Sequence, residues 1–211
     1  MFNQKTHWDK LWDKSILKRE KSQPSNFAYE IIENIELPKG SKILDLACGR
    51  GDDLEFFLEK GFKVVAVDFS NRALKFIQEK FKPYWKNEVL KVKLIDLNQK
   101  FLEQKDYFDL VYSNFGLHYF SLKRTNELFK SIFQILKLKG WLAFTVKSLN
   151  DPLFGCGTHI KENMYLYNEH LRQFLKEDFL RNICLKQFKI IKFDEVKETS
   201  KVFFQCLAQK S

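Results

Sequence analysis

A glycine-containing turn carries the densest group of ligand-binding residue types in the sequence. The segment LDLACGRGDD (residues 44–53) combines a short apolar run with two glycines and three aspartates. Glycine lets the backbone adopt positive φ and approach a ligand closely. On open α/β sheets, ligands bind beyond the carboxyl ends of the strands, where such turns lie. The segment therefore predicts a strand, a ligand-binding turn and the start of a helix.

Two acids directly after the glycines indicate which ligand this turn accepts. A dinucleotide-binding fingerprint needs a third small residue three positions after Gly51, where this chain has Leu54. Asp52 and Asp53 stand at the helix start, where phosphates would have to lie, so their carboxylates would repel a dinucleotide. They suit a ligand with a sulfonium and an ammonium group, as S-adenosylmethionine has.

Two further aspartates follow the next two predicted strands. Asp68 closes a strand 19 positions after Gly49, where an acid can accept hydrogen bonds from both hydroxyls of a ribose. Asp96 follows the third strand, where its carboxylate is placed to accept from an adenine amine. Together with Asp45, these acids occur at the ends of three successive strands. The sequence therefore predicts an acidic crevice that binds a positively charged nucleoside.

These motifs resemble the class I S-adenosylmethionine-dependent methyltransferases. The resemblance covers about residues 40–147, through LDLACGRGDD, VVAVDFS, LIDLN, FDLVYSNFGLHYF and LKLKGWLAFTVKS. The most similar branch is that of small-molecule methyltransferases, which includes the tellurite-resistance type. The later segment NDPLFGCGTHI…HLRQFLKEDFL resembles the lid region of that branch.

The resemblance implies a role for individual residues. Gly49 and Gly51 would line the methionine part of the cofactor. Asp68 would hold the ribose, and Phe69 would pack on the adenine. Asn114 would lie beside the transferred methyl group. The full set of expected cofactor contacts is Asp45, Ala47, Cys48, Gly49, Gly51, Asp53, Asp68, Phe69, Ser70, Asp96, Leu97 and Asn114.

Strand-like and helix-like runs alternate along the chain, which favours a sheet covered by helices on both faces. We predict an α/β fold: a doubly wound, mostly parallel seven-stranded sheet with an antiparallel last strand, of the Rossmann-like methyltransferase type. The last two strands are expected to pair through a turn near 195–200. Predicted strands are 42–46, 63–67, 89–95, 108–112, 141–147, 188–193 and 202–208, and predicted helices are 5–19, 24–38, 52–60, 70–81, 121–138 and 171–184.

We expect residues 1–211 to form a single methyltransferase domain with two additions. Residues 1–38 would be an N-terminal helical cap, and residues 149–172 an irregular insertion on the substrate side. The insertion follows the fifth strand, so its ends lie near the same edge as the cofactor. The candidate acceptor contacts are Trp12, Phe115, Tyr119, His159, Tyr165 and His170.

Methyl transfer from a sulfonium places few demands on the protein. The reaction is an in-line displacement, so the protein mainly aligns the reactants and excludes water. A metal or a catalytic triad is not required, and no metal site is expected. A general base matters only when the acceptor begins protonated. His118, which follows the fourth strand, is the candidate catalytic residue. The acceptor atom stays open among oxygen, nitrogen, sulfur, carbon and a metalloid.

The composition fits one globular domain in a reducing compartment. The 211 residues are 45% hydrophobic and 30% charged. The formal net charge is +9, but the lysines are spread along the chain, which favours a solvated surface. The four cysteines lack C-x-x-C spacing, which predicts free thiols. The N-terminus is too polar for a secretory signal, and no apolar run nears the roughly 20 residues that span a bilayer. We therefore expect a cytoplasmic location without a membrane partner.

Three alternative functions stay open at this point. The charge of +9 is compatible with a nucleic-acid methyltransferase, but Ser113-Asn114-Phe115-Gly116 replaces the Asn/Asp-Pro-Pro-aromatic turn of enzymes that methylate base amines. A non-catalytic module that only binds the cofactor is the second. A nicotinamide-dependent oxidoreductase is the third, and the acids after Gly51 disfavour it. A small-molecule acceptor is therefore favoured over a nucleic acid.

Overall fold

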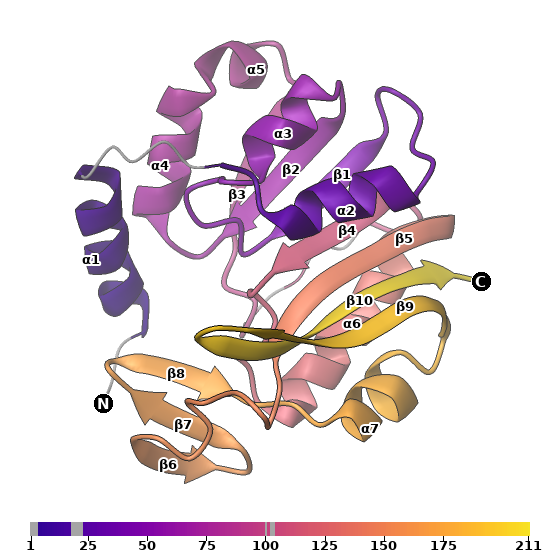
Figure 1. The fold of residues 1–211 in the computed structure, drawn as a ribbon. Coiled ribbons are helices and arrows are strands. Elements are labelled where there is room, and N and C mark those ends of the chain that lie inside the picture. Colours follow the sequence, from indigo (N-terminus) through magenta and orange to yellow (C-terminus); the bar gives the residue numbers. More distant parts are fainter. Residues whose placement is uncertain (1–3, 18–22, 100, 102–103) are drawn as a thin grey trace.

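A seven-stranded sheet forms the centre of the molecule (Figure 1). The computed structural model describes residues 4–17, 23–99, 101 and 104–211. The strand order is β3-β2-β1-β4-β5-β10-β9, and β10 runs antiparallel to both of its neighbours. The strands are β1 (Lys42–Leu46), β2 (Lys63–Asp68), β3 (Leu90–Leu94), β4 (Phe108–Asn114), β5 (Leu136–Lys147), β9 (Phe188–Glu198) and β10 (Lys201–Lys210). This confirms the predicted fold class.

The direction of winding reverses between β1 and β4, which pair in parallel at the middle of the sheet. β1 continues outward to β2 and β3, whereas β4 continues in the other direction to β5. At such a switch point the loops that follow neighbouring strands diverge and leave a crevice. The glycine turn follows β1, and the segment that begins at Phe115 follows β4. Both loops therefore border one crevice.

Both faces of the sheet are buried, so its central strands are apolar on both sides. Along β2, Val65 and Val67 belong to one core cluster, whereas Val64 and Ala66 belong to the other. This alternation follows from the two-residue period of a strand, and apolar residues on both faces are typical of a parallel sheet.

Helices supply the other side of each core. Residues of α2, α3 and α4 pack on one face of the sheet, and α6 with the turns at 177–184 packs on the other (Figure 1). Serine side chains cap α2, α4 and α6 at Ser25, Ser70 and Ser121, each worth about 1 kcal/mol. The helices are α1 (Gln4–Leu17), α2 (Asn26–Asn34), α3 (Leu54–Glu59), α4 (Asn71–Lys80), α5 (Lys82–Lys86), α6 (Leu122–Ile135), α7 (Glu177–Phe179) and the π-helical turn η1 (Leu180–Cys184).

The sequence predicts an irregular insertion, and this prediction is wrong. The insertion forms a second sheet. Strands β6 (Thr158–Lys161), β7 (Met164–Tyr167) and β8 (His170–Gln173) pair in an antiparallel meander. The two residues between β7 and β8, Asn168 and Glu169, have φ of 49° and 61°, as a type I′ hairpin turn requires. The predicted helix over 171–184 is therefore wrong at its start, because β8 pairs with β7. Only α7 and η1 are helical in that stretch.

Two smaller differences concern the helices. The predicted helix over 121–138 ends at Ile135, because Leu136 is extended and opens β5. The short helix α5 was not predicted. Residues 18–19 of the first predicted helix lie outside the described residues. None of the helices in the described part of the chain combines the length and apolarity that a bilayer crossing needs.

Candidate cofactor and acceptor site

A cavity lies at the carboxyl ends of the central strands, where α1 covers it. The open space in it, including solvent at its mouth, is about 580 Å³. Most of its wall is aromatic or aliphatic. The lining residues are Trp8, Trp12, Ala47, Asp68, Phe69, Ile95, Asp96, Leu97, Asn98, Phe115, Gly116, Tyr119 and Phe120.

Asp68 fixes the shape of the glycine turn at the edge of this cavity. Its carboxylate accepts hydrogen bonds from the backbone N–H of Gly49 at 2.9 Å and from that of Ser70 at 2.8 Å. Gly49 has φ of 55°, a left-handed conformation that favours glycine. Burial raises the pKa of Asp68 to about 6, although the backbone donors oppose this rise. Asp68 therefore lines the cavity as a carboxylate at neutral pH.

Asp53 and Asn114 are engaged within the protein. The Asp53 carboxylate accepts from the Ser25 backbone N–H at 2.7 Å, the Tyr112 hydroxyl at 2.7 Å and the Asn114 side-chain amide at 3.3 Å. The Asn114 oxygen in turn accepts from the Thr145 hydroxyl at 2.7 Å. These bonds join the start of α2, the glycine turn and the ends of β4 and β5. The Asn114 side chain is therefore turned toward Asp53 and Thr145, and Asn114 does not line the cavity.

Asp45 is a buried acid near the end of β1, next to the glycine turn. Its side chain is 4% exposed. Burial raises the pKa of Asp45 well above its usual range, and the charges of Asp53, Asp68 and Asp52 raise it further. The cation next to this group, Arg50, forms an ion pair with Asp52 at 2.7 Å. The turn therefore concentrates negative charge that a cationic ligand would relieve.

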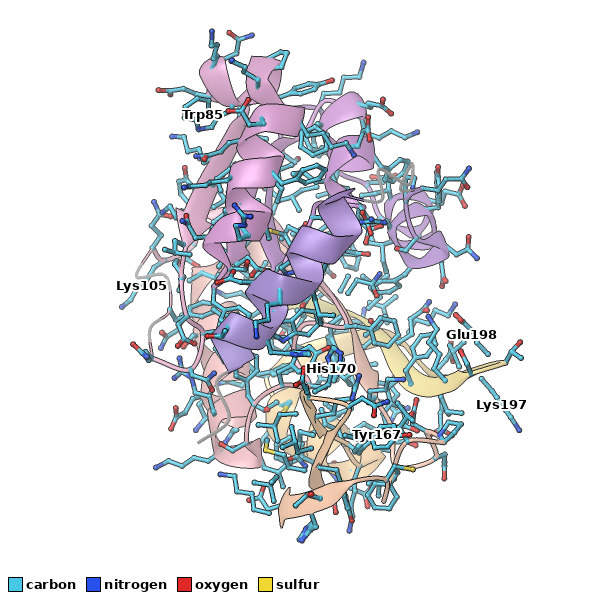
Figure 2. The ribbon with its side chains drawn as sticks, turned by 90° about the vertical axis from the view of Figure 1, so that its left-hand side faces the viewer. Trp85, Lys105, Tyr167, His170, Lys197 and Glu198 are labelled. Carbon is cyan, nitrogen blue, oxygen red and sulfur yellow. The ribbon has the colours of Figure 1, made fainter. Side chains whose placement is uncertain are left out.

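Helix α1 lies across the crevice and contacts both of its ends. An added Cβ on Gly49 would lie 2.9 Å from two carbons of the Trp12 indole, so the ring rests directly on the glycine turn. Asp9 accepts a hydrogen bond from the Ser70 hydroxyl at the cofactor end. His7 pairs with Glu169 at 3.1 Å at the other end, and Figure 2 shows the neighbouring His170 next to this end of α1.

Aromatic side chains form the wall opposite the glycine turn. The Trp8 ring packs edge to face against the rings of Tyr119 and His170, with distances of 5.4 Å and 5.1 Å between ring centres. His118 is 1% exposed, and its Nδ1 has no hydrogen-bond partner in the described part of the chain. Burial lowers the pKa of His118 well below its usual range, and the charge of Lys147 lowers it further. His118 is therefore a neutral imidazole at pH 7.

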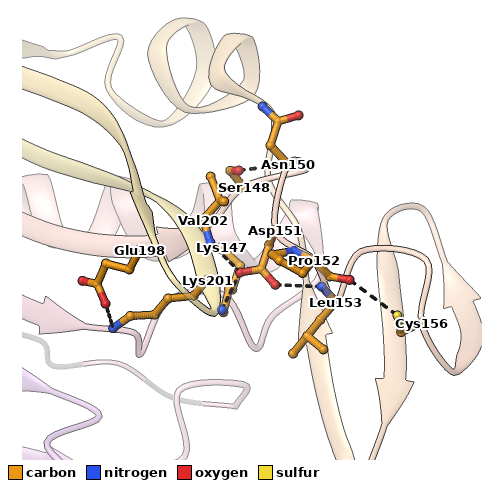
Figure 3. Close-up of polar contacts among 10 residues, drawn as sticks. All are labelled: Lys147, Ser148, Asn150, Asp151, Pro152, Leu153, Cys156, Glu198, Lys201 and Val202. Carbon is orange, nitrogen blue, oxygen red and sulfur yellow. Dashed lines mark hydrogen bonds and ion pairs between the residues drawn. The ribbon is translucent and has the colours of Figure 1, made fainter.

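A buried ion pair supports this wall from behind (Figure 3). Lys147 donates to the Asp151 carboxylate at 2.5 Å, and Asp151 also accepts from the backbone N–H groups of Val202 and Leu153. The Lys147 ammonium lies 5.7 Å from the centre of the Phe115 ring. Because Phe115 lines the cavity, the pair fixes one part of the cavity wall.

This arrangement is similar to that of known methyltransferases. Residues 43–140 match the family model described as a methyltransferase domain. A solved methyltransferase of Clostridium acetobutylicum, dependent on S-adenosylmethionine, superimposes with a TM-score of 0.71 at 20% identity, over 99% of this chain and 100% of its own. The chain has the class I methyltransferase fold. Methyltransferases of this fold use S-adenosylmethionine, and the match therefore implies that cofactor.

Two other matches differ in how much of each chain they cover. A curated relative, "Putative methyltransferase YqeM" of Bacillus subtilis, is 36% identical over 117 residues, which are 53% of this chain and 44% of the relative. The chain spans less than half the length of the curated relatives it matches. The 1,6-didemethyltoxoflavin-N1-methyltransferase of Burkholderia thailandensis has a TM-score of 0.69 at 18% identity, over 94% of this chain and 83% of its own. That structure contains bound 1,6-didemethyltoxoflavin and S-adenosylhomocysteine.

The methyltransferase fold brings many of the predicted residues to the cavity, but not all of them. Those that line it are Ala47, Asp68, Phe69, Asp96, Leu97, Trp12, Phe115 and Tyr119. Gly49, Ser70 and His170 lie directly beside this lining, through the contacts given above, and the His118 ring centre lies 4.4 Å from that of Tyr119. Asp45 is buried next to the glycine turn. Gly51 does not face the cavity, because an added Cβ there would meet Leu54 and Ile77 of the core. Cys48 is held in the turn, and burial raises the pKa of its thiol.

His159 and Tyr165 lie away from the cavity. The His159 ring bonds to the Glu162 carbonyl at 2.7 Å. The Tyr165 ring packs against Phe154 and Phe174 of the insertion. Their backbones pair across β6 and β7, so they serve the second sheet. We assigned them to the acceptor because the insertion was read as a loop that folds over the site.

Gly116 and Asp9 belong to the site, although the sequence did not indicate them as contacts. An added Cβ on Gly116 would lie 2.5 Å from the Ser113 hydroxyl and 2.7 Å from the Ala47 Cβ. Glycine is therefore required where β4 and the glycine turn meet. A glycine four positions after the predicted end of a central strand is a signal for this approach. Asp9 is one acid on a polar helix surface and gives no comparable signal.

Trp12→Ala is expected to release S-adenosylhomocysteine about tenfold faster, because the indole that rests on the glycine turn no longer covers the crevice. Stopped-flow displacement of the bound nucleoside gives the dissociation rate. Trp85→Ala is the matched control, since Trp85 is 43% exposed on α5 (Figure 2). An unchanged or slower dissociation rate in Trp12→Ala would contradict the covering role of α1.

Proposed function

We propose that this chain transfers a methyl group from S-adenosylmethionine to a small-molecule acceptor. The observation that carries the proposal is the group of buried acids at the glycine turn, Asp45, Asp53 and Asp68. A ligand with ammonium and sulfonium groups complements this charge, whereas a pyrophosphate would add to it. The small-molecule branch of the methyltransferases, with its tellurite-resistance type, is the subfamily that we favour.

The residues of the cavity fit the cofactor at both of its ends. Asp68 would accept from the ribose hydroxyls, and Phe69 and Leu97 would border the adenine, with Asp96 at its edge. The Gly49 turn, with Asp45 behind it, would hold the methionine part. S-adenosylmethionine supplies a methyl group on a positively charged sulfur, which becomes a neutral thioether once the acceptor has taken the methyl. The protein's contribution is to bind, align and dehydrate the reactants.

His118 is the residue that we assign to proton removal from the acceptor. It is buried and neutral, and its Nδ1 has no partner within the described residues, so this nitrogen can accept a proton. A neutral imidazole near the cavity serves acceptors whose reacting atom begins protonated. Acceptors that begin as anions would instead use the imidazole as a hydrogen-bonding partner.

The covered cavity favours a small molecule over a nucleic acid. Trp8 and Trp12 of α1 cover it, and its walls are mostly aromatic or aliphatic. The similar 1,6-didemethyltoxoflavin-N1-methyltransferase supports such an acceptor. A cytoplasmic location is part of the same proposal, and the four unpaired cysteines support it.

The proposal is tested by calorimetric titration of the full chain with S-adenosylmethionine, S-adenosylhomocysteine and NADH. We expect both adenosyl compounds to bind and NADH not to bind. Incubation of the chain and S-adenosylmethionine with a metabolite extract, before and after ribonuclease treatment, should release S-adenosylhomocysteine equally in both samples. Release that ribonuclease abolishes would favour an RNA acceptor. Binding of NADH in place of the adenosyl compounds would overturn the proposal.

A further inference from the structure

The two ends of the crevice differ in charge. Buried carboxylates of Asp45, Asp53 and Asp68 gather around the glycine turn. The cations lie at the other end, where Lys147 and Lys201 are within 5.7 Å and 4.7 Å of the Phe115 ring centre and Arg172 lies on β8. An acceptor placed opposite the cofactor therefore meets the basic end.

Among the three cations at this end, Arg172 forms no ion pair with a carboxylate in the described part of the chain. Lys147 is paired with the buried Asp151, and Lys201 with Glu198 at 3.1 Å (Figure 3). The hydrogen bond of the Arg172 guanidinium goes to the Tyr167 carbonyl at 3.3 Å. A guanidinium has five donors, so most of them stay available to a ligand.

Arg172 lies beside the cavity lining rather than in it, on the face of β8 that carries His170. Arg172 and His170 are two positions apart on β8, so their side chains lie on the same face of the strand. The His170 ring contacts Trp8 at 5.1 Å, and Trp8 lines the cavity. The charge of Arg172 also acts on this wall, because after burial it is the largest cause that lowers the pKa of His170 to about 4.

Unsatisfied polar atoms near Arg172 indicate that this wall binds a ligand. His118 Nδ1, His170 Nδ1 and Gln173 Oε1 are buried without a partner within the described residues. His118 and Gln173 are 1% and 0% exposed, and the Gln173 backbone N–H donates to the His118 carbonyl at 2.8 Å. Buried polar groups normally have partners. Gln173 points to the other face of β8 from Arg172, but the charge of Arg172 acts on both His118 and His170. The unsatisfied nitrogens of these two histidines therefore point to a polar ligand.

Resting on the proposed function, we infer that the acceptor is a small molecule with an anionic group, such as a carboxylate, and that the Arg172 guanidinium binds this group. The aromatic rings of Trp8 and Tyr119 would hold the body of the acceptor. A cationic amine is the opposite possibility, because such rings also attract cations. Arg172 would repel a cation there. The acids at this end already have partners: Glu169 pairs with His7, Asp151 with Lys147 and Glu198 with Lys201.

Three probes of matched size separate these possibilities. Benzoate, benzamide and benzylamine are titrated by calorimetry into the chain saturated with S-adenosylhomocysteine. We expect benzoate to bind about tenfold more tightly than benzamide, and benzylamine to bind most weakly. Arg172→Gln should remove the difference between benzoate and benzamide. Arg172→Lys should keep part of it, because the charge stays but the planar fork is lost.

Arg181→Gln is the matched control, since Arg181 forms an ion pair with Glu177 at 2.6 Å on α7 and η1. It should leave the order of the probes unchanged. Tightest binding of benzylamine, a benzoate preference that survives in Arg172→Gln, or no benzoate binding at millimolar concentration would each overturn the inference. Failure of S-adenosylhomocysteine to bind at the saturation step would instead overturn the proposed function, and the acceptor inference with it.

Discussion

Asp68→Asn is expected to weaken S-adenosylhomocysteine binding by at least about 100-fold. The loss of two hydrogen bonds from the ribose hydroxyls to a charged carboxylate accounts for this factor. Asp68 lines the cavity, and its oxygens also hold the Gly49 and Ser70 backbone N–H groups. In asparagine, an NH₂ group, which donates, replaces one of these accepting oxygens and would face another donor. The substitution therefore removes a ribose acceptor and disturbs the turn. Calorimetric titration at pH 7.5 measures the loss.

Asp96→Asn is the control for this substitution. Asp96 also lines the cavity, but its carboxylate accepts from the exposed Asn98 backbone N–H alone within the described residues. Its loss should weaken binding by tenfold or less. A folded Asp68→Asn protein that binds as tightly as the native chain would remove Asp68 from the cofactor site.

The same carboxylate predicts a pH dependence of binding. Because the pKa of Asp68 is about 6, lowering the pH below 6 converts the acceptor into a neutral acid. The affinity for S-adenosylhomocysteine should therefore be constant above about pH 7 and fall up to tenfold per pH unit below 6. Titrations between pH 5 and 8 check this. Asp68→Asn should lack this dependence, and the same slope in that variant would assign the titration to another group.

Asp151→Ala is expected to destabilise the chain by about 3–5 kcal/mol, because it leaves the buried Lys147 ammonium without its counter-charge. Asp151 is 3% exposed and Lys147 is 8% exposed. The substitution also removes the acceptor of the Val202 and Leu153 backbone N–H groups. The loss is measured as the free energy of unfolding from urea denaturation.

Two further variants show whether the buried charge causes this loss. Lys147→Met in the Asp151→Ala background should restore part of the stability, because it removes the unpaired ammonium. Glu177→Gln, which breaks an exposed ion pair with Arg181, should cost about 1 kcal/mol or less. If Asp151→Ala costs no more than Glu177→Gln, the buried pair does not support the fold.

The central sheet and the cofactor end were predictable because local signals agree there with the tertiary structure. β1 has the predicted bounds, and Asp68 ends β2 at the cavity. Apolar runs of four to six residues between glycine turns and amphipathic helices leave few other arrangements than a parallel sheet. The acids at the ends of these strands can then be assigned to the cofactor end of the sheet without knowledge of the side-chain contacts.

The acceptor end was less predictable because it depends on contacts between distant segments. Leu171, Phe174 and Leu175 have helical spacing, but pairing with β7 keeps 170–173 extended. His159 was assigned to the site by its position in the insertion, although β6 and β7 carry it away. The hydrogen bonds of Asp53 reach Ser25 and Tyr112 from separate elements, and no local pattern in the sequence encodes that network.

The position of α1 has a consequence for the kinetics of turnover. One helix contacts Ser70 at one end of the crevice and Glu169 at the other. Both products would consequently leave the crevice only when α1 moves away from it. The steady-state turnover rate would then be set by how often α1 opens rather than by bond formation, as is common in gated enzymes. Solvent viscosity is the variable to which such a rate responds.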